Sequence, residues 1–233
     1  MDVPFPPIRF SGNANRAFKN ICIFYRNILI LHPIRNHLCD RQSFLKQIKM
    51  KQKICQFILK LIGWKAVVTA EIPQKCIFCV APHTSNLDFI LGKIMFCAIG
   101  GKRPSFLIKK EWFIFPFGLI FNRIGGIPVD RSKKTSLVDQ IVKRFEEQDR
   151  FQVAITPEGT RKANPKWKMG FYHIAKKAQV PILLTYFDYK KKEIGIDRHF
   201  IPTDDEKEDM RQIKFYFKDV VGRHPEGFTI GNV

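Results

Sequence analysis

A histidine and an aspartate five residues apart could carry out acid–base chemistry in this protein. They stand in the stretch Ala81-Pro82-His83-Thr84-Ser85-Asn86-Leu87-Asp88, between an apolar run over residues 76–80 and an apolar-rich segment over residues 89–99. This order predicts a buried strand, a short turn and a helix. Because a neutral imidazole can take up a proton near pH 7, we expect His83 to act as a general base. Asp88 would accept a hydrogen bond from one ring nitrogen and leave the other for the substrate.

Both residues also have a purely structural interpretation. Ser85-Asn86-Leu87-Asp88 has the pattern of a capping box, in which the serine and the acidic residue bind the first N–H groups of a helix. His83 could be a histidine whose ring nitrogens are satisfied within the turn. The pair is therefore a weak signal by itself, and other groups must indicate a substrate site.

The stretch Pro157-Glu158-Gly159-Thr160-Arg161 follows a strand expected over residues 151–156. Gly159 would let the backbone approach a ligand, and Arg161 with neighbouring N–H groups could hold a phosphate. Glu158 could fix this arginine or accept a hydrogen bond from a substrate hydroxyl. The alternative is a tight surface turn with a solvated ion pair. A second Pro-Glu-Gly, at residues 225–227, follows an expected helix, and we interpret it as a helix stop.

Another arginine stands at the end of a further expected strand, in Gly125-Gly126-Ile127-Pro128-Val129-Asp130-Arg131. Alone, Arg131 would more often form a surface ion pair. Together with Arg161 it could form a two-arginine phosphate site.

These blocks, in this order and followed by Val180-Pro181-Ile182, resemble the glycerolipid acyltransferases typified by lysophosphatidic acid acyltransferase. The resemblance covers residues 83–182. It implies transfer of a fatty acyl group from acyl-CoA or acyl carrier protein to the hydroxyl of a lysophospholipid such as 1-acylglycerol 3-phosphate, in phospholipid biosynthesis. Glycerol 3-phosphate or a lyso-aminolipid is the alternative acceptor.

The resemblance also implies roles for individual residues. His83 matches the catalytic base and Asp88 the residue that orients it, and backbone N–H groups at the start of the following helix are candidates to stabilise an oxyanion. The positions associated with the acceptor and its phosphate are matched by Arg131, Glu158, Gly159, Thr160 and Arg161, and an apolar wall by Val180, Pro181 and Ile182. Three positions depart from the family pattern and leave the acceptor open: Ala81-Pro82, Thr156 and Pro128.

The composition favours polyanionic partners. The chain carries 40 Lys and Arg against 21 Asp and Glu, a formal net charge of +19. Such an excess suits nucleic acid, an anionic membrane surface or phosphorylated substrates. Because no zinc-finger, RRM, KH or P-loop pattern occurs, we expect a membrane surface and phosphorylated lipids and no nucleic acid. A nucleic-acid-binding module is the non-enzymatic alternative, and a lipid hydrolase the enzymatic one.

We expect neither a metal nor a cofactor. Cys76 and Cys79 form a C-x-x-C, but no second pair follows at the spacing of a zinc site. Residues three apart on a strand point to opposite faces. The cysteines are therefore expected to be free thiols in a reducing cytosol.

The length of 233 residues and the alternation of strand-like and helical segments predict one α/β domain. We expect a mostly parallel or mixed central sheet flanked by helices and preceded by an amphipathic N-terminal helix. Residues 1–49 are expected to be a poorly ordered basic leader, or to precede the natural start, and 50–233 to be the acyltransferase domain. Strands are expected at 65–72, 75–80, 105–109, 124–129, 151–156, 180–187 and 193–200, helices at 51–64, 85–99, 132–148, 167–178 and 203–221, and a loop or short helix at 113–121.

The helix expected over residues 51–64 has one apolar face and ends at Trp64. It could pack on the domain's own core, or lie in a membrane interface with its aromatic residues at headgroup depth. No run reaches the roughly 18 uncharged apolar residues of a membrane span. We therefore expect a peripheral protein on the cytoplasmic face of a membrane. The apolar face consists of Ile54, Phe57, Ile58, Leu61 and Ile62.

Overall fold

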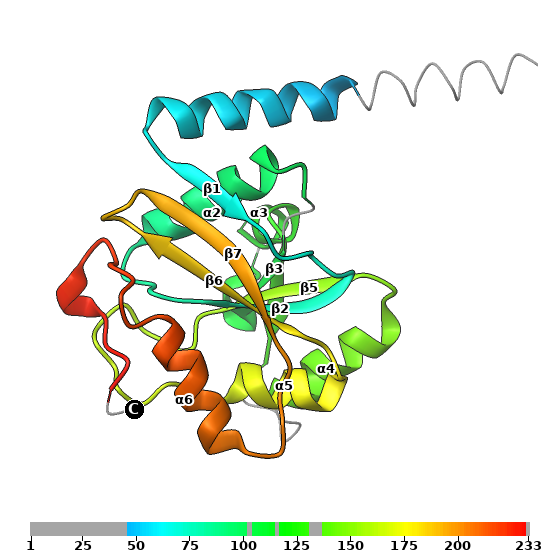
Figure 1. Ribbon diagram of the computed structural model, residues 1–233. Coiled ribbons are helices and arrows are strands. Elements are labelled where there is room, and N and C mark those ends of the chain that lie inside the picture. Colours follow the sequence, from blue (N-terminus) through cyan, green and yellow to red (C-terminus); the bar gives the residue numbers. More distant parts are fainter. Residues whose placement is uncertain (1–45, 102–103, 115–116, 131–136, 232–233) are drawn as a thin grey trace, which may run out of the picture. The chain divides into compact units, whose positions relative to one another are not determined.

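The computed structural model describes residues 46–101, 104–114, 117–130 and 137–231 (Figure 1). The chain divides into two compact units, residues 1–50 and 51–233. Only residues 46–50 of the first unit are described, and they are helical. The expected leader thus lies almost entirely outside the described residues, and its boundary stays a prediction. The fold and the site described below belong to the second unit.

A seven-stranded mixed sheet forms the centre of this unit, in the order β1-β7-β6-β2-β5-β3-β4. β2, β3, β4, β5 and β6 run parallel to one another, whereas β7 is antiparallel to β6 and β1 runs parallel to β7. The expected α/β domain with a mixed sheet is confirmed. The strands are β1 Lys65–Val68, β2 Lys75–Val80, β3 Ser105–Lys109, β4 Gly126–Val129, β5 Phe151–Ile155, β6 Ile182–Asp188 and β7 Glu193–Phe200.

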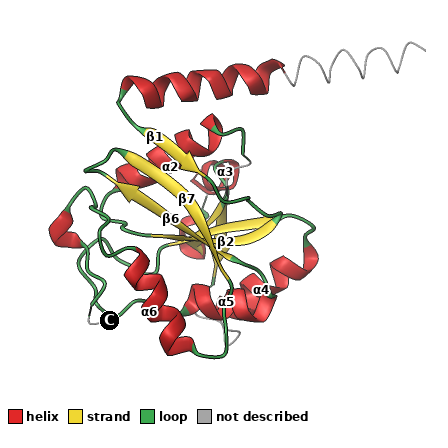
Figure 2. Ribbon diagram, in the orientation of Figure 1, coloured by secondary structure: helices red, strands yellow, loops and turns green. Residues whose placement is uncertain are grey.

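Helices cover both faces of the sheet, so the middle strands are buried on both sides (Figure 2). One core contains Leu91 and Met95 of α2 (Asn86–Ala98), and the other contains residues of three helices on the opposite face. Because both faces of β2 are covered, its apolar run is continuous rather than alternating. The helices of the second face are α4 Leu137–Glu147, α5 Gly170–Ala178 and α6 Glu206–Tyr216; shorter elements are η1 Lys110–Trp112, α3 Phe117–Arg123 and η2 Pro225–Gly227.

The parallel arrangement decides where the functional turns lie. β2, β5 and β6 are adjacent and parallel, so their carboxyl ends meet at one edge of the sheet. The segment containing His83 follows β2, and the segment containing Glu158 follows β5. Residues far apart in the sequence are thereby brought to one place, as is usual for sites in open α/β sheets.

The last long helix differs from the expectation at both ends. It begins at Glu206 rather than near Thr203, and the side chain of Asp205 caps it by accepting the N–H of Glu208. Thr203 instead donates its N–H and its hydroxyl to the buried Asp209. The helix ends at Tyr216, so residues 224–227 are not its stop; residues 225–227 form a separate 3₁₀ turn.

The helix over residues 51–61 turns polar side chains toward the domain. The side-chain amides of Gln52 and Gln56 both donate to the carbonyl of Ala98 at the end of α2. Leu59 is 4% exposed, whereas Phe57 and Leu61 are 65% and 73% exposed. Packing on the domain's own core therefore does not account for the apolar face of this helix. Trp64, expected at headgroup depth, is buried in the core with Leu59. None of the helices in the described part of the chain is long and apolar enough to cross a membrane.

Two leucines of this helix should differ sharply in their effect on stability. Leu59→Ala should lower the free energy of unfolding by about 2–5 kcal/mol, because it opens a cavity in the core. Leu61→Ala should change it by less than about 0.5 kcal/mol, because that side chain lies in solvent. Urea unfolding of both variants measures the difference. Equal losses of unfolding free energy in the two variants would show that the helix is not packed on the core through Leu59.

Candidate active site

The turn after β2 brings the ring of His83 to the carboxylate of Asp88. Nδ1 of His83 lies 3.2 Å from Oδ2 of Asp88, and the aspartate side chain is only 2% exposed. An imidazole that donates Nδ1–H to a carboxylate carries its lone pair on Nε2. The His83 side chain is 20% exposed, so this second nitrogen can meet a substrate. The geometry is that of a base and a residue that orients it.

The same carboxylate also begins α2. Oδ2 of Asp88 accepts the N–H groups of Thr84 (3.1 Å) and Ser85 (3.0 Å). The hydroxyl of Ser85 caps the helix from the other side by accepting the N–H of Leu87 at 3.2 Å. The capping box predicted from the sequence is confirmed. It coexists with the histidine contact, so one carboxylate both starts the helix and holds the ring.

This network bears on the oxyanion donors expected at the start of the helix. The N–H groups of Thr84, Ser85, Leu87 and Asp88 already have partners within the turn. They are therefore committed to the capping box and to the aspartate. The expected oxyanion donors are not found among these four groups.

Glu158 connects the turn after β5 to the turn after β2. Both of its carboxylate oxygens accept the backbone N–H of His83, at 3.0 and 3.2 Å, and the residue is 2% exposed. The sequence predicts that Glu158 fixes Arg161 or accepts a hydrogen bond from a substrate hydroxyl. In the structure its carboxylate instead binds the backbone of His83. Burial raises the pKa of Glu158 from 4.5 to about 7; the His83 N–H opposes the shift and the nearby Asp88 charge adds to it.

The loop after Glu158 is held by its own backbone. Gly159 has φ +66°, a left-handed conformation that favours glycine, and a Cβ atom there would lie 2.7 Å from Cε of Lys168. The N–H of Lys168 donates to the carbonyl of Pro157 at 2.7 Å, and the Asn164 side chain donates to the carbonyl of Glu158 at 2.9 Å. The N–H of Gly159 itself donates to Thr156. Glycine at this position thus serves the left-handed conformation of the turn, whereas the Lys168 side chain could move away from a Cβ atom.

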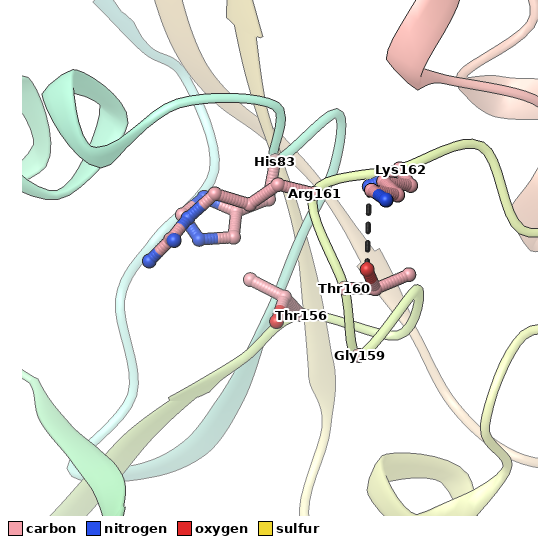
Figure 3. Close-up of a pocket in the computed structure, with 6 residues that line it drawn as sticks. All are labelled: His83, Thr156, Gly159, Thr160, Arg161 and Lys162. Atoms are coloured by element: carbon pink, nitrogen blue, oxygen red, sulfur yellow. Dashed lines mark hydrogen bonds between the residues drawn. The ribbon is translucent and has the colours of Figure 1, made fainter.

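The two turns line an open pocket of about 380 Å³ (Figure 3). Figure 3 shows the His83 and Arg161 side chains extending to the same side of the turns. The Arg161 side chain therefore shares the pocket with the candidate base, and Lys162 is also among its lining residues. A phosphate and a neighbouring hydroxyl could be held there together. The lining residues are His83, Thr156, Gly159, Thr160, Arg161 and Lys162.

Other residues expected at the site are not brought to this pocket. Val180, Pro181 and Ile182 lie at the start of β6, where Ile182 pairs with Ile77 in the first half of β2. His83 follows the opposite end of that strand, and Val180 and Ile182 are buried in the core. Arg131 lies outside the described residues, so the two-arginine phosphate site stays a prediction. Its neighbour Asp130 lies 3.6 Å from Lys110 across the adjacent strand end.

Two parts of the site were missed in the sequence. The hydroxyl of Tyr189, directly after β6, donates to Oδ1 of Asp88 at 2.6 Å. The segment 222–227 packs on Thr84, whose hydroxyl accepts the N–H of His224 at 3.2 Å. A signal for Tyr189 existed, because it follows a parallel strand as His83 does. The packing of residues 222–227 has no local sequence signal.

The cysteines are buried thiols in the structure. Burial raises the pKa of Cys76 to about 12 and also raises that of Cys79. Such thiols are poor nucleophiles at neutral pH. Among the residues that the structure describes, no group of three or more His, Cys, Asp or Glu side chains could hold a metal ion.

Comparisons with known proteins agree with this architecture. The family model described as Acyltransferase matches residues 66–186, or 121 of 233 residues, from β1 into β6. The fold is similar to that of PlsC, the 1-acyl-sn-glycerophosphate (LPA) acyltransferase from Thermotoga maritima. The TM-score is 0.50, with 16% sequence identity over 72% of this chain and 76% of that chain. A search of curated protein sequences finds no significant match.

Glu158 should make stability depend on pH in a specific window. Its folded-state pKa lies above its ordinary value, so between pH 4.5 and about 7 the folded chain binds more protons than the unfolded chain. Its contribution to the free energy of unfolding therefore falls as pH rises through this window, by up to ~3 kcal/mol. Glu158→Gln can still accept the His83 N–H but cannot ionise, so this fall should disappear.

Urea unfolding of the wild type and the variant from pH 4.5 to 7.5 isolates the effect as a difference. The free energy of unfolding of Glu158→Gln minus that of the wild type should increase with pH across this window. A constant difference across the window would contradict the raised pKa of Glu158.

Proposed function

The chain belongs to the acyltransferase family, and from this premise we propose that it transfers a fatty acyl group from an acyl thioester to the hydroxyl of a lysophospholipid such as 1-acylglycerol 3-phosphate. One observation carries the proposal: the His83–Asp88 pair opens into a pocket that also contains Arg161 and Lys162. Such a pocket suits an acceptor that has a hydroxyl close to a phosphate. The product would be a phospholipid with one further ester.

In the proposed mechanism, Nε2 of His83 removes the proton from the acceptor hydroxyl. The hydroxyl oxygen attacks the thioester carbonyl, the new carbon–oxygen bond forms, and the carbon–sulfur bond breaks. The imidazolium then returns its proton to the departing sulfur, so the products are an ester and a thiol. Asp88 stabilises the imidazolium through Nδ1. General base catalysis of this kind contributes about 10²–10⁴-fold to the rate.

Acceptor binding would depend on the two cations of the pocket. Arg161 can hold a phosphate through two parallel hydrogen bonds, and Lys162 adds a second positive charge. Orientation of the phosphate places the neighbouring hydroxyl at the base. Glycerol 3-phosphate presents the same two groups, so it remains an alternative acceptor; a lyso-aminolipid is the other alternative.

The acyl donor would be acyl-CoA or acyl carrier protein. Both present the fatty acid as a thioester, and both are acidic, which suits a chain of formal net charge +19. The proposed chemistry uses only the protein's own acid–base groups, so these donors are co-substrates and no cofactor takes part.

We place the enzyme on the cytoplasmic face of a membrane as a peripheral protein. The helix over residues 51–61 exposes Ile54, Phe57 and Leu61, and it also carries the exposed residues Lys51, Lys53 and Lys60. An interfacial helix combines such an apolar face with cationic neighbours. A second exposed apolar set, Trp112, Ile114, Leu119 and Ile120, lies in and before α3 and could contact the acyl chain.

Thiol release from acyl-CoA and acyl carrier protein tests the proposed reaction. Release should depend on the acceptor, and a 1-acylglycerol 3-phosphate should be preferred over a 1-acylglycerol that lacks the phosphate. Product mass should show one added acyl group.

Arg161→Ala should raise the acceptor KM by roughly 10-fold or more, as expected for the loss of a charged hydrogen bond. It should also reduce the preference for 1-acylglycerol 3-phosphate over 1-acylglycerol.

Other outcomes have distinct meanings. Thiol and free fatty acid released without an acceptor would identify a hydrolase. No release with any acceptor, from protein that is folded by circular dichroism, would contradict the proposed function. A fall in kcat alone for Arg161→Ala would contradict its binding role.

The exposed face of the helix over residues 51–61 should bind anionic membranes. Replacing both Phe57 and Leu61 by Ser should weaken flotation with phosphatidylcholine–phosphatidylglycerol vesicles by about 10-fold or more, given the apolar area removed. Phe215→Ser is the matched control, because Phe215 is 52% exposed but lies on α6. Equal losses of flotation in the double variant and in Phe215→Ser would contradict this placement. A wild type that retards RNA in a mobility-shift assay but does not float with the vesicles would contradict it as well.

A further inference from the structure

We propose that Tyr189 is a positioning residue for the catalytic pair, acting on His83 through Asp88. The inference rests on the proposed role of His83 as the base. Tyr189 follows β6 directly and lies beyond residues 66–186, the region that the family model matches. Its hydroxyl donates to Oδ1 of Asp88 at 2.6 Å, the shortest of the hydrogen bonds described for this carboxylate.

Tyr189 can position Asp88 because the two oxygens of the carboxylate have different partners. Oδ2 of Asp88 faces the histidine ring and the backbone N–H groups of the turn, all within 3.2 Å. Oδ1 receives the tyrosine hydroxyl from the other side. Donors on both oxygens prevent the carboxylate from rotating about its bond to Cβ. Oδ2 therefore stays directed at Nδ1 of His83 while the ring gains and loses a proton.

The tyrosine is suited to donate throughout the reaction. Burial and the charge of Asp88 raise the pKa of Tyr189, so its hydroxyl stays protonated at neutral pH. A hydrogen bond from a neutral donor also lowers the cost of keeping a buried carboxylate ionised. Asp88 can then stabilise the imidazolium without taking its proton.

Three elements fix the tyrosine itself. Its ring meets Trp64 edge to face, with centroids 4.8 Å apart and planes at 86°. Its backbone N–H donates to the carbonyl of Val221 at 2.8 Å, and Asp188 directly before it accepts the N–H groups of Lys190 and Lys191. Since Trp64 is itself buried beside the helix over residues 51–61, the ring has support from a part of the chain remote from β6.

Tyr189→Phe tests the proposal, because it removes only the hydroxyl and keeps the ring on Trp64. It should lower kcat about 10-fold, as expected for a lost hydrogen bond to a charged group, and leave both KM values unchanged. In an Asp88→Ala background the same change should alter kcat less than about 2-fold, because the hydroxyl would then have no carboxylate to position. A rise in KM, an unchanged kcat, or the same loss in both backgrounds would overturn the proposal.

Tyr172→Phe is the matched control. Tyr172 also donates to a buried carboxylate, that of Asp209 at 2.7 Å, but it lies on α5 and does not line the pocket. It should lose stability in thermal unfolding and keep its kcat. If it loses kcat as Tyr189→Phe does, the effect is general destabilisation and the proposal fails.

A spectroscopic measurement separates this proposal from the proposed function. The proton NMR resonance of His83 Nδ1–H should move in Tyr189→Phe and stay in place in Tyr172→Phe. This measurement needs no substrate, and it applies even if Asp88→Ala does not fold. If the resonance moves but the protein shows no acyl transfer, the positioning contact is supported and the proposed function is contradicted. If the resonance does not move, the positioning contact is contradicted.

Discussion

The need to satisfy one buried carboxylate determines the arrangement of this site. Asp88 is almost completely enclosed, and an isolated charge in such a position is costly unless several donors surround it. The donors come from its own helix start, from His83 and from Tyr189 beyond β6. The first two kinds of donor belong to the turn between β2 and α2, and Tyr189 follows β6, so the carboxylate joins the ends of two strands. The proposed catalytic geometry therefore depends on the same hydrogen bonds as the local stability.

A second buried carboxylate extends this arrangement to the neighbouring strand. Glu158 holds the backbone of His83, while Asp88 holds its side chain, so the residue is fixed from two directions. The turn that carries Glu158 also carries Arg161, a cationic residue of the pocket. Thr84 adds a third connection, because residues 222–227 pack on it. His83 and Arg161 are thus held in position by residues that do not themselves line the pocket.

The sequence predicted the α/β domain, the strands and the capping box well, because apolar periodicity and local hydrogen-bonding patterns report on local structure. It could not assign the partners of Glu158 or find Tyr189, since these contacts join residues 75 and 101 positions apart. The apolar block Val180-Pro181-Ile182 was expected near the substrate. The register of β6 with β2 instead places it away from the pocket. Likewise, periodicity found the apolar face of the first helix but could not tell that Gln52 and Gln56 donate to the carbonyl of Ala98 at the end of α2.

The central claim is that His83 removes the proton of the acceptor hydroxyl within a site built to hold it. The most direct measurement is the kcat for acyl transfer by purified, folded His83→Ala with saturating donor and acceptor. The account predicts a loss of about 100-fold or more, with little change in the acceptor KM, because the phosphate contacts of Arg161 remain. A kcat close to that of the wild type would contradict it.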